Sequence, residues 1–133
     1  MRNRAAAIII REGKLLLMRR HKPGRDYYIL PGGGVKLDES YPDACIREVK
    51  EETGLDVAGL QLVFTNFYRG LQEQYFLARV SEGVPILGGV EAARNSPNNA
   101  YSLEWLGEEE VEAVNLLPAA AKRYCLAVIR NKI

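Results

Sequence analysis

Residues 30–55 read LPGGGVKLDESYPDACIREVKEETGL, and this stretch contains the clearest helix signal in the chain. Ser40 is a favourable N-cap residue, and Pro42 falls in the first turn, where its missing N–H is harmless. Gly54 follows Thr53 and is a typical C-terminal stop. The pattern therefore predicts a helix that begins near Pro42 and ends at Thr53.

The predicted helix carries a cluster of carboxylates on one face near its C-terminal end. Glu48 and Glu52 are separated by one turn, and Glu51 lies beside them, three positions after Glu48. Like charges at this spacing and the negative end of the helix dipole together destabilise the helix by about 1 kcal/mol. A divalent cation reverses both effects, and Mg²⁺ is the natural candidate because it prefers oxygen ligands. The helix alone leaves a solvated charged face as the alternative.

The glycines and the acidic helix together resemble the signature of the Nudix hydrolase family, G-x5-E-x7-R-E-U-x-E-E-x-G-U, in which U is a bulky apolar residue. Every specified position is matched over residues 33–55, by Gly33, Glu39, Arg47, Glu48, Val49, Glu51, Glu52, Gly54 and Leu55. The resemblance implies an α/β (α+β) fold, an α/β/α sandwich on a mixed β-sheet. We expect residues 1–133 to form a single domain of this kind.

The resemblance also implies a reaction and the residues that perform it. Members hydrolyse a pyrophosphate bond in a nucleoside diphosphate linked to another group X, with Mg²⁺, for which Mn²⁺ can substitute, as cofactor. Glu39 would support the metal site and Arg47 would hold a ligand carboxylate in place. Gly33 would shape the loop before the helix, and Gly54 would end the helix. The implied metal ligands are Glu48, Glu51 and Glu52.

The general base has several candidates. In some members of the family the carboxylate that corresponds to Glu48 activates the water, and in others a downstream Glu does so. The downstream candidates in this chain are Glu91 and Glu104. Family members often place a further acidic ligand shortly before a late Trp, but Asn98 and Asn99 occupy those positions before the Trp here.

The substrate is less sharply defined by the sequence. A small member without the substrate signatures of other branches is most similar to the MutT-like enzymes that hydrolyse nucleoside triphosphates. ADP-ribose, nucleotide sugars and 5′-pyrophosphorylated RNA remain alternatives, as does a non-catalytic nucleotide-sensing module. Turn chemistry and ordinary solvation explain several of the candidate substrate contacts equally well. These contacts are Arg20, Glu91, Arg94 and Asn98.

The remaining segments predict a sheet flanked by helices. Two hairpins are expected, around Glu12-Gly13 and Arg69-Gly70, and the glycines at 32–34 predict a loop. Residues 83–99, rich in Gly, Pro and Asn, predict a long loop. The expected strands are Ala5–Arg11, Lys14–Arg20, Tyr27–Leu30, Leu60–Tyr68, Leu71–Val80 and Tyr101–Leu106, and the later helices are Glu108–Val114 and Pro118–Arg130.

Composition excludes several classes of protein. The chain has 133 residues, a formal net charge of +1 and two cysteines, which argues against a disulfide scaffold and favours a cytoplasmic location. The longest uncharged apolar run, Ala5–Ile10, is far shorter than the roughly 20 residues of a membrane span. Near-neutral charge disfavours nucleic acid as the partner and leaves a small nucleotide. The oligomeric state is open, and a homodimer is possible.

Overall fold

The first hairpin forms where two apolar runs flank a turn that accepts positive φ. β1 (Arg4–Arg11) and β2 (Lys14–Lys22) are antiparallel and are joined by Glu12 and Gly13, whose φ angles are 52° and 76°. Such a two-residue turn matches the twist of the strands that it connects. The computed structural model describes residues 2–131, and it confirms the predicted hairpin.

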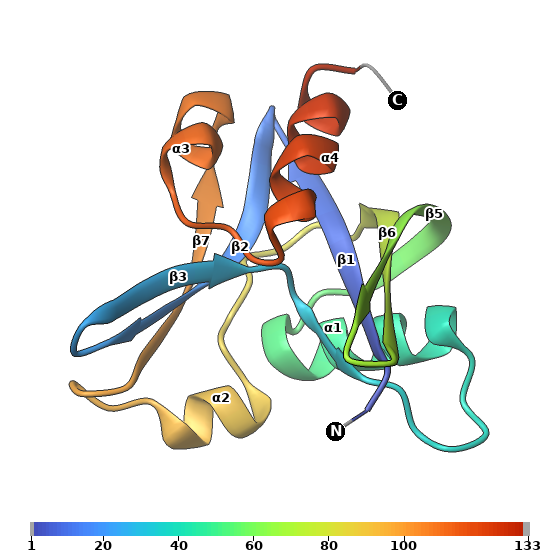
Figure 1. Cartoon of the computed structure of the whole chain (residues 1–133), viewed down its shortest axis with the longest axis horizontal. Coiled ribbons are helices and arrows are strands. Elements are labelled where there is room, and N and C mark those ends of the chain that lie inside the picture. Colours follow the sequence, from blue (N-terminus) through green and yellow to red (C-terminus); the bar gives the residue numbers. More distant parts are fainter. Residues whose placement is uncertain (1, 132–133) are drawn as a thin grey trace.

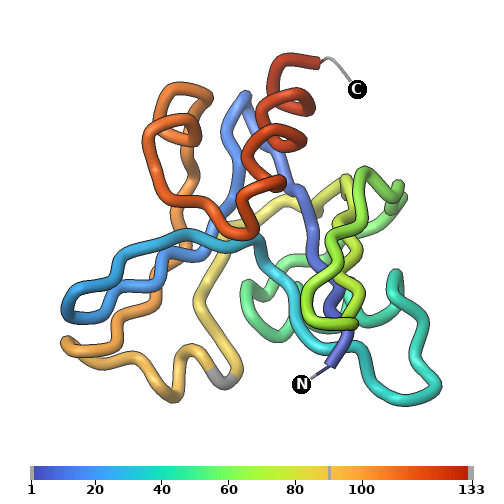
Figure 2. Tube along the Cα trace, viewed as in Figure 1, coloured from blue at the N-terminus to red at the C-terminus, as the bar shows by residue number. Residues whose placement is uncertain are grey.

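The strands form one mixed sheet (Figures 1 and 2). Its order is β3-β2-β1-β6-β5, with β4 paired to β1 and β7 paired to β2. β1 and β6 are parallel, and the other pairs are antiparallel. The bounds of the later strands are β3 Arg25–Ile29, β4 Gly32–Gly34, β5 Val57–Tyr68, β6 Leu71–Val80 and β7 Ala100–Leu106.

Helices cover both faces of the sheet, as the predicted sandwich requires (Figure 1). Alternate residues of β1 point to opposite faces: Ala7 and Ile9 pack with α1 (Tyr41–Thr53), whereas Ile8 packs with α3 (Glu108–Ala113) and α4 (Ala119–Ile129). The cysteines divide in the same way. Cys45 lies in the α1 core and Cys125 in the α4 core, and burial raises the pKa of both thiols to about 12.

The caps of α1 are the ones that the sequence predicts. The Ser40 Oγ accepts a hydrogen bond from the Asp43 N–H at 3.2 Å. Gly54 adopts a φ of 75°, and its N–H donates to the Lys50 carbonyl at 2.9 Å. These local interactions fix both ends of the helix that carries the carboxylates.

Two segments predicted as loops contain regular structure. Residues 32–34 form the short strand β4 instead of a free loop, because they pair with the first residues of β1. A side chain at Gly32 would collide with the backbone of β1, which explains why a glycine run fits this close pairing. The predicted loop at 83–99 contains the short helix α2 (Gly89–Arg94), in which the Ala92 N–H donates to the Gly88 carbonyl at 3.4 Å.

A third difference lies at the start of β5, which begins at Val57, three residues before the predicted Leu60. The pairing of β5 with β6 shifts register between Ala58 and Gln61. Gly59, with a φ of 62°, lies within this bulge. A bulge interrupts the alternation of apolar residues, so the periodicity of the sequence does not extend to the true start of the strand.

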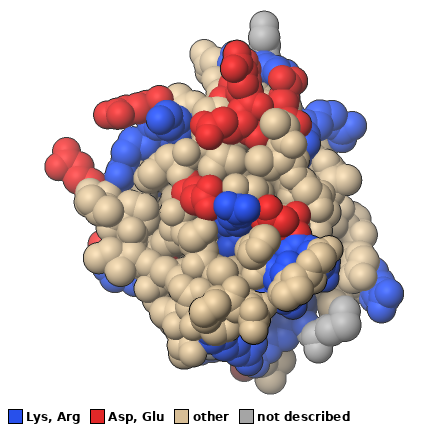
Figure 3. All heavy atoms as spheres, turned by 90° about the vertical axis from the view of Figure 1, so that its left-hand side faces the viewer, with Lys and Arg blue, Asp and Glu red and all other residues tan. Residues whose placement is uncertain are grey.

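The surface agrees with the balanced composition. Most of the face drawn in Figure 3 is neither basic nor acidic, and described Lys and Arg side chains lie beside Asp and Glu side chains in several places on it. Within residues 2–131, no helix is both long enough and apolar enough to cross a membrane.

Candidate active site

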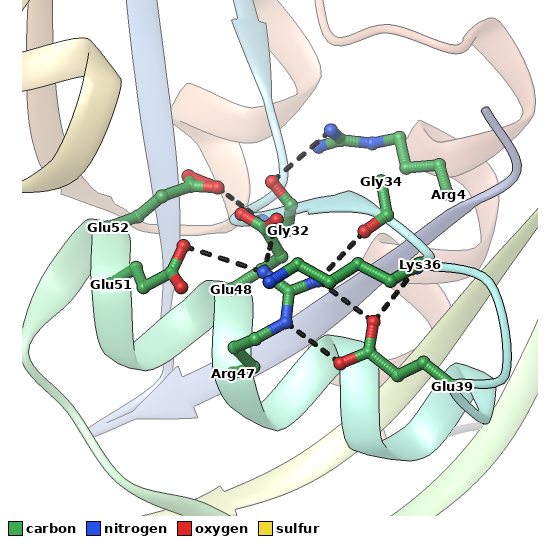
Figure 4. A network of polar contacts seen from close by, with 9 residues as sticks. All are labelled: Arg4, Gly32, Gly34, Lys36, Glu39, Arg47, Glu48, Glu51 and Glu52. Carbon is green, nitrogen blue, oxygen red and sulfur yellow. Dashed lines mark hydrogen bonds and ion pairs between the residues drawn. The ribbon is translucent and has the colours of Figure 1, made fainter. Parts of the chain in front are cut away.

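The carboxylates of α1 gather where the helix passes the glycine strand β4 (Figure 4). Glu48, Glu51 and Glu52 line a cavity of about 290 Å³, together with the three glycines of β4, Glu91 and Arg4. We call it the carboxylate cavity. Residues from β1, β4, α1 and α2 therefore meet at one site, although they are distant in the sequence.

Glu52 is the buried member of this cluster. Its side chain lies on the inner face of α1, the residue is 3% exposed, and its Oε1 accepts a hydrogen bond from the Gly32 N–H at 3.2 Å. Burial raises the pKa of Glu52 to about 8, the nearby Glu91 adds to the rise, and the Arg4 guanidinium opposes it. A buried carboxylate with acidic neighbours is stabilised when a cation joins it.

Arg47 holds the more exposed carboxylates in place. Its Nε and Nη2 donate to the two oxygens of Glu39 at 2.8 and 2.9 Å, and its Nη1 donates to Glu48 Oε1 at 2.8 Å. An ion pair of Arg47 with Glu51, four positions along the helix, is also present at 3.5 Å. These bonds from Arg47, helped by the Lys36 N–H, hold the pKa of Glu39 at about 2. Glu39 therefore anchors Arg47, and Arg47 orients Glu48.

Two glycines allow the backbone to approach the carboxylates closely. A Cβ at Gly33 would collide with the Glu48 carboxylate, so glycine at this position leaves the room that Glu48 occupies. A Cβ at Gly88 would lie 2.5 Å from the Glu51 carbonyl oxygen, and the Gly88 N–H donates to the Glu52 carbonyl at 2.8 Å. Gly88 thereby fixes the start of α2 against the end of α1.

The two downstream candidates for the general base, Glu91 and Glu104, lie in different surroundings. Glu91, on α2, lines the carboxylate cavity. Glu104, on β7, does not line it, and its two oxygens accept hydrogen bonds from the Tyr28 hydroxyl at 3.0 Å and the Ser102 hydroxyl at 2.8 Å. Of the two, only Glu91 can reach a group bound among the helix carboxylates.

The other predicted substrate contacts lie away from this cavity. The Arg20 guanidinium stacks on the Tyr101 ring at 4.0 Å and donates to Asn99 Oδ1 at 3.2 Å. Arg94 and Asn98 are exposed and do not line the cavity. Neither Arg4 nor Gly88 is predicted as a site residue, although the Gly88-Gly89 pair within 83–99 is a signal of close backbone approach.

The donor set suits a hard divalent cation, although the side chains are turned toward protein partners. Glu48 faces Arg47 and Glu52 faces the Gly32 N–H, so no group of three acidic, His or Cys side chains within residues 2–131 is arranged as a closed metal site. Each of Glu48, Glu51 and Glu52 nevertheless has an oxygen without a hydrogen bond to any described residue. Oxygen donors around a cavity open to water are the environment in which Mg²⁺ binds.

Comparison with known proteins agrees with this geometry. The family model described as NUDIX domain matches residues 1–126. A MutT-like protein of Streptomyces ambofaciens is 36% identical over 109 residues, which cover 80% of this chain and 64% of that protein. An ADP-ribose pyrophosphatase of Methanocaldococcus jannaschii is 45% identical over 49 residues, 36% of this chain and 29% of that protein. The matched region is less than two thirds of the length of either relative.

A solved structure supports the fold independently. A hydrolase of the NUDIX family from Clostridium perfringens superposes with a TM-score of 0.74 at 18% identity, covering 98% of each chain. At this level of identity the likeness establishes the mixed sheet with flanking helices and nothing finer.

Proposed function

The chain belongs to the NUDIX domain family, and on that premise we propose that it hydrolyses a pyrophosphate bond in a nucleoside diphosphate linked to a second group, with Mg²⁺ or Mn²⁺ as cofactor. The observation that carries the proposal is the gathering of Glu48, Glu51 and the buried Glu52 around one cavity. Nudix hydrolases generally use divalent metal ions, and the oxygen donors of this cavity suit one. We propose residues 1–133 as a single domain that contains this site.

Different side chains would bind the metal, position its ligands and accept a proton in such a reaction. Glu48, Glu51 and Glu52 would hold the metal, which neutralises phosphate charge and lowers the pKa of bound water. Glu39 and Arg47 would keep Glu48 in its rotamer, so that little reorganisation is needed when a substrate binds. Glu91 would accept the proton of the attacking water, because it is the downstream carboxylate that lines the cavity.

We propose a nucleoside triphosphate as the substrate, with the nucleoside monophosphate as a product. The similarity to a MutT-like protein over 80% of the chain supports this choice. ADP-ribose is the second candidate, because the stretch of 49 residues similar to an ADP-ribose pyrophosphatase is 45% identical.

A substrate panel tests the proposal directly. The protein with millimolar Mg²⁺ is incubated with normal and oxidised nucleoside triphosphates, ADP-ribose, nucleotide sugars, dinucleoside polyphosphates and triphosphorylated RNA. Released phosphate and pyrophosphate are measured for the triphosphates and the RNA, and nucleotide products such as the nucleoside monophosphate are separated by chromatography for the other substrates. We expect turnover of at least one triphosphate. Nucleotide binding without any hydrolysis across the panel would instead support a sensing module.

Metal binding is expected to raise thermal stability. Millimolar Mg²⁺ or Mn²⁺ should increase the melting temperature by a few degrees, because a ligand that binds only the folded state stabilises it by mass action. Differential scanning fluorimetry with and without metal measures the shift. The control is a Ca²⁺-free buffer that contains EDTA and has the same ionic strength, so that a shift in melting temperature caused by salt screening alone is recognised. An unchanged melting temperature throughout the titration would contradict the metal assignment.

Glu91 and Glu104 are expected to behave differently. Glu91→Gln should lower kcat about 100-fold, because it removes the proposed proton acceptor without changing its size. Glu104→Gln should leave kcat within about threefold of the wild-type value, because its carboxylate bonds to Tyr28 and Ser102 outside the cavity. Steady-state kinetics of both variants checks this. The reverse order of effects would assign the general base to Glu104.

A further inference from the structure

Arg4 is the first residue of β1, and two backbone carbonyls hold its guanidinium. Figure 4 shows the bond to Gly32. Its Nη2 donates to the Leu30 carbonyl at 2.7 Å, and its Nη1 donates to the Gly32 carbonyl at 3.3 Å. A guanidinium carries five N–H donors, so these two bonds leave donors for a ligand. The register of the sheet sets this position, because Arg4 pairs with Gly34 on β4 and with Glu73 on β6.

Two cavities meet at this side chain. One is the carboxylate cavity. The other has a volume of about 310 Å³ and is also lined by Arg4, together with residues of β3, β5 and β6. Of the described lining residues, Arg4 alone is shared by the two cavities. We call the second one the aromatic cavity, and its walls include Asn66, Tyr68, Glu73, Tyr75 and Pro118.

The aromatic cavity combines a rigid ring with fixed polar groups. The Tyr75 ring stacks on Phe64 with a centroid separation of 4.4 Å and an interplanar angle of 4°. Glu73 Oε1 accepts hydrogen bonds from the Asn66 amide at 2.9 Å and from the Tyr75 hydroxyl at 3.2 Å. Flat apolar walls with a few fixed polar groups suit the base and ribose of a nucleoside.

Arg4 is a basic side chain that lines both cavities, and the other charged residues described around them are acidic. The described residues that line the carboxylate cavity include four Glu, and those that line the aromatic cavity include Glu73. Arg4 is the one basic side chain among the described residues lining either cavity. A phosphate that passes between the cavities would meet repulsion from carboxylates on both sides, and the Arg4 guanidinium is the fixed group of the protein that offsets it.

We propose that Arg4 binds the phosphate that joins a nucleoside seated in the aromatic cavity to the pyrophosphate bond broken in the carboxylate cavity. This inference rests on the proposed function and adds to it the direction of the substrate. The nucleoside lies toward β5 and β6, and the scissile bond lies toward α1. Arg4 is then a substrate-binding residue that the signature does not contain.

The test compares ligands that differ only by the phosphate. Binding of AMP, GMP, CMP and UMP, and of the four corresponding nucleosides, is measured by calorimetry with millimolar Mg²⁺. For the monophosphate that binds most tightly, Arg4→Gln should weaken affinity about 10- to 100-fold, because a charge-assisted pair is lost. Affinity for the matching nucleoside should change less than about threefold. The monophosphate affinity of Arg4→Lys should lie between those of the wild type and Arg4→Gln, because lysine keeps the charge but lacks the planar guanidinium with its paired donors.

Arg2→Gln is the matched control, because Arg2 is exposed and lines neither cavity. An equal loss of affinity for monophosphate and nucleoside in the Arg4 variants would show that Arg4 merely holds the Leu30 and Gly32 carbonyls, and would overturn the inference. Unchanged monophosphate affinity, or no monophosphate binding by the wild type, would also overturn it. If Arg4→Gln does not fold, the test uses Arg4→Lys, for which the loss of affinity for the monophosphate is compared with the loss of affinity for the nucleoside. The hydrolysis panel tests the proposed function separately.

Discussion

Replacing Glu52 with glutamine is expected to lower hydrolysis of the nucleotide substrate about 1,000-fold or more while the protein remains folded. Glu52 is the proposed metal ligand that is buried at the end of α1, and the amide keeps its size but removes its charge. Because each tenfold loss of rate corresponds to about 1.4 kcal/mol, the expected loss is about 4 kcal/mol of transition-state stabilisation. Initial rates at saturating Mg²⁺ measure it.

Folding of the variant must be shown in the same experiment. Because the pKa of Glu52 is about 8, its carboxyl in the metal-free protein is mostly protonated at pH 7. The neutral amide of Glu52→Gln should therefore leave the stability of the metal-free protein nearly unchanged at that pH, so a loss of activity cannot be attributed to unfolding. Glu109→Gln, an exposed change on α3, is the control for a general effect of charge. Near-normal turnover by Glu52→Gln would remove the metal assignment and, with it, the proposed mechanism.

Local interactions explain why much of the site could be predicted from sequence. Ser40 and Gly54 cap α1 through bonds to residues three or four positions away, and Arg47 pairs with Glu48 and Glu51 on the same helix. Interactions of this range are encoded by spacing alone. The order of the carboxylates along the helix therefore sufficed to predict their common face.

Long-range pairing explains what the sequence does not reveal. Arg4 reaches the site because β1 lies between β4 and β6, and the sequence of β1 gives no sign of either partner. Glu104 was a reasonable candidate by its position before Trp105, but the pairing of β7 with β2 places it against Tyr28 instead. Sheet register decides such contacts, and one-dimensional periodicity does not contain it.

The same limit applies to the glycines. Positive φ is the usual reason for a glycine run, and it predicts a loop at 32–34. In the structure the run pairs as β4, and Gly33 is needed because the Glu48 carboxylate occupies the space of its side chain. The requirement comes from α1, which follows β4 in the chain and packs back on it, so it appears only in three dimensions.

The stability of the metal-free protein is expected to fall as pH rises from about 5 to 8. The folded-state pKa of Glu52 is about 8, above its ordinary value of 4.5, so folding favours the protonated carboxyl. The stabilisation is complete below pH 4.5 and is lost as pH rises through 8, because the unfolded chain then gains more from ionisation than the folded protein does. The total change is on the order of 4 kcal/mol.

The contribution of Glu39 to the free energy of unfolding changes with pH in the direction opposite to that of Glu52, and in a lower range of pH. Its folded-state pKa is about 2, so its contribution is present above pH 4.5 and is lost as pH falls toward 2. Urea unfolding in EDTA at several values of pH between 5 and 8.5 therefore isolates Glu52. The free energy of unfolding of Glu52→Gln should change much less with pH over this range, and the difference between the two proteins is the measured quantity.

A bound divalent metal should oppose the fall in stability that we expect for the metal-free wild type as pH rises. A divalent cation binds the ionised carboxylates, so its stabilising effect should grow as pH rises toward 8 and the proton on Glu52 becomes easier to displace. With Mg²⁺ present, the wild type should keep its stability between pH 7 and 8, whereas Glu52→Gln should gain little from the metal. If both proteins showed the same pH dependence in EDTA and the same gain with Mg²⁺, Glu52 would be neither a strained buried acid nor a ligand.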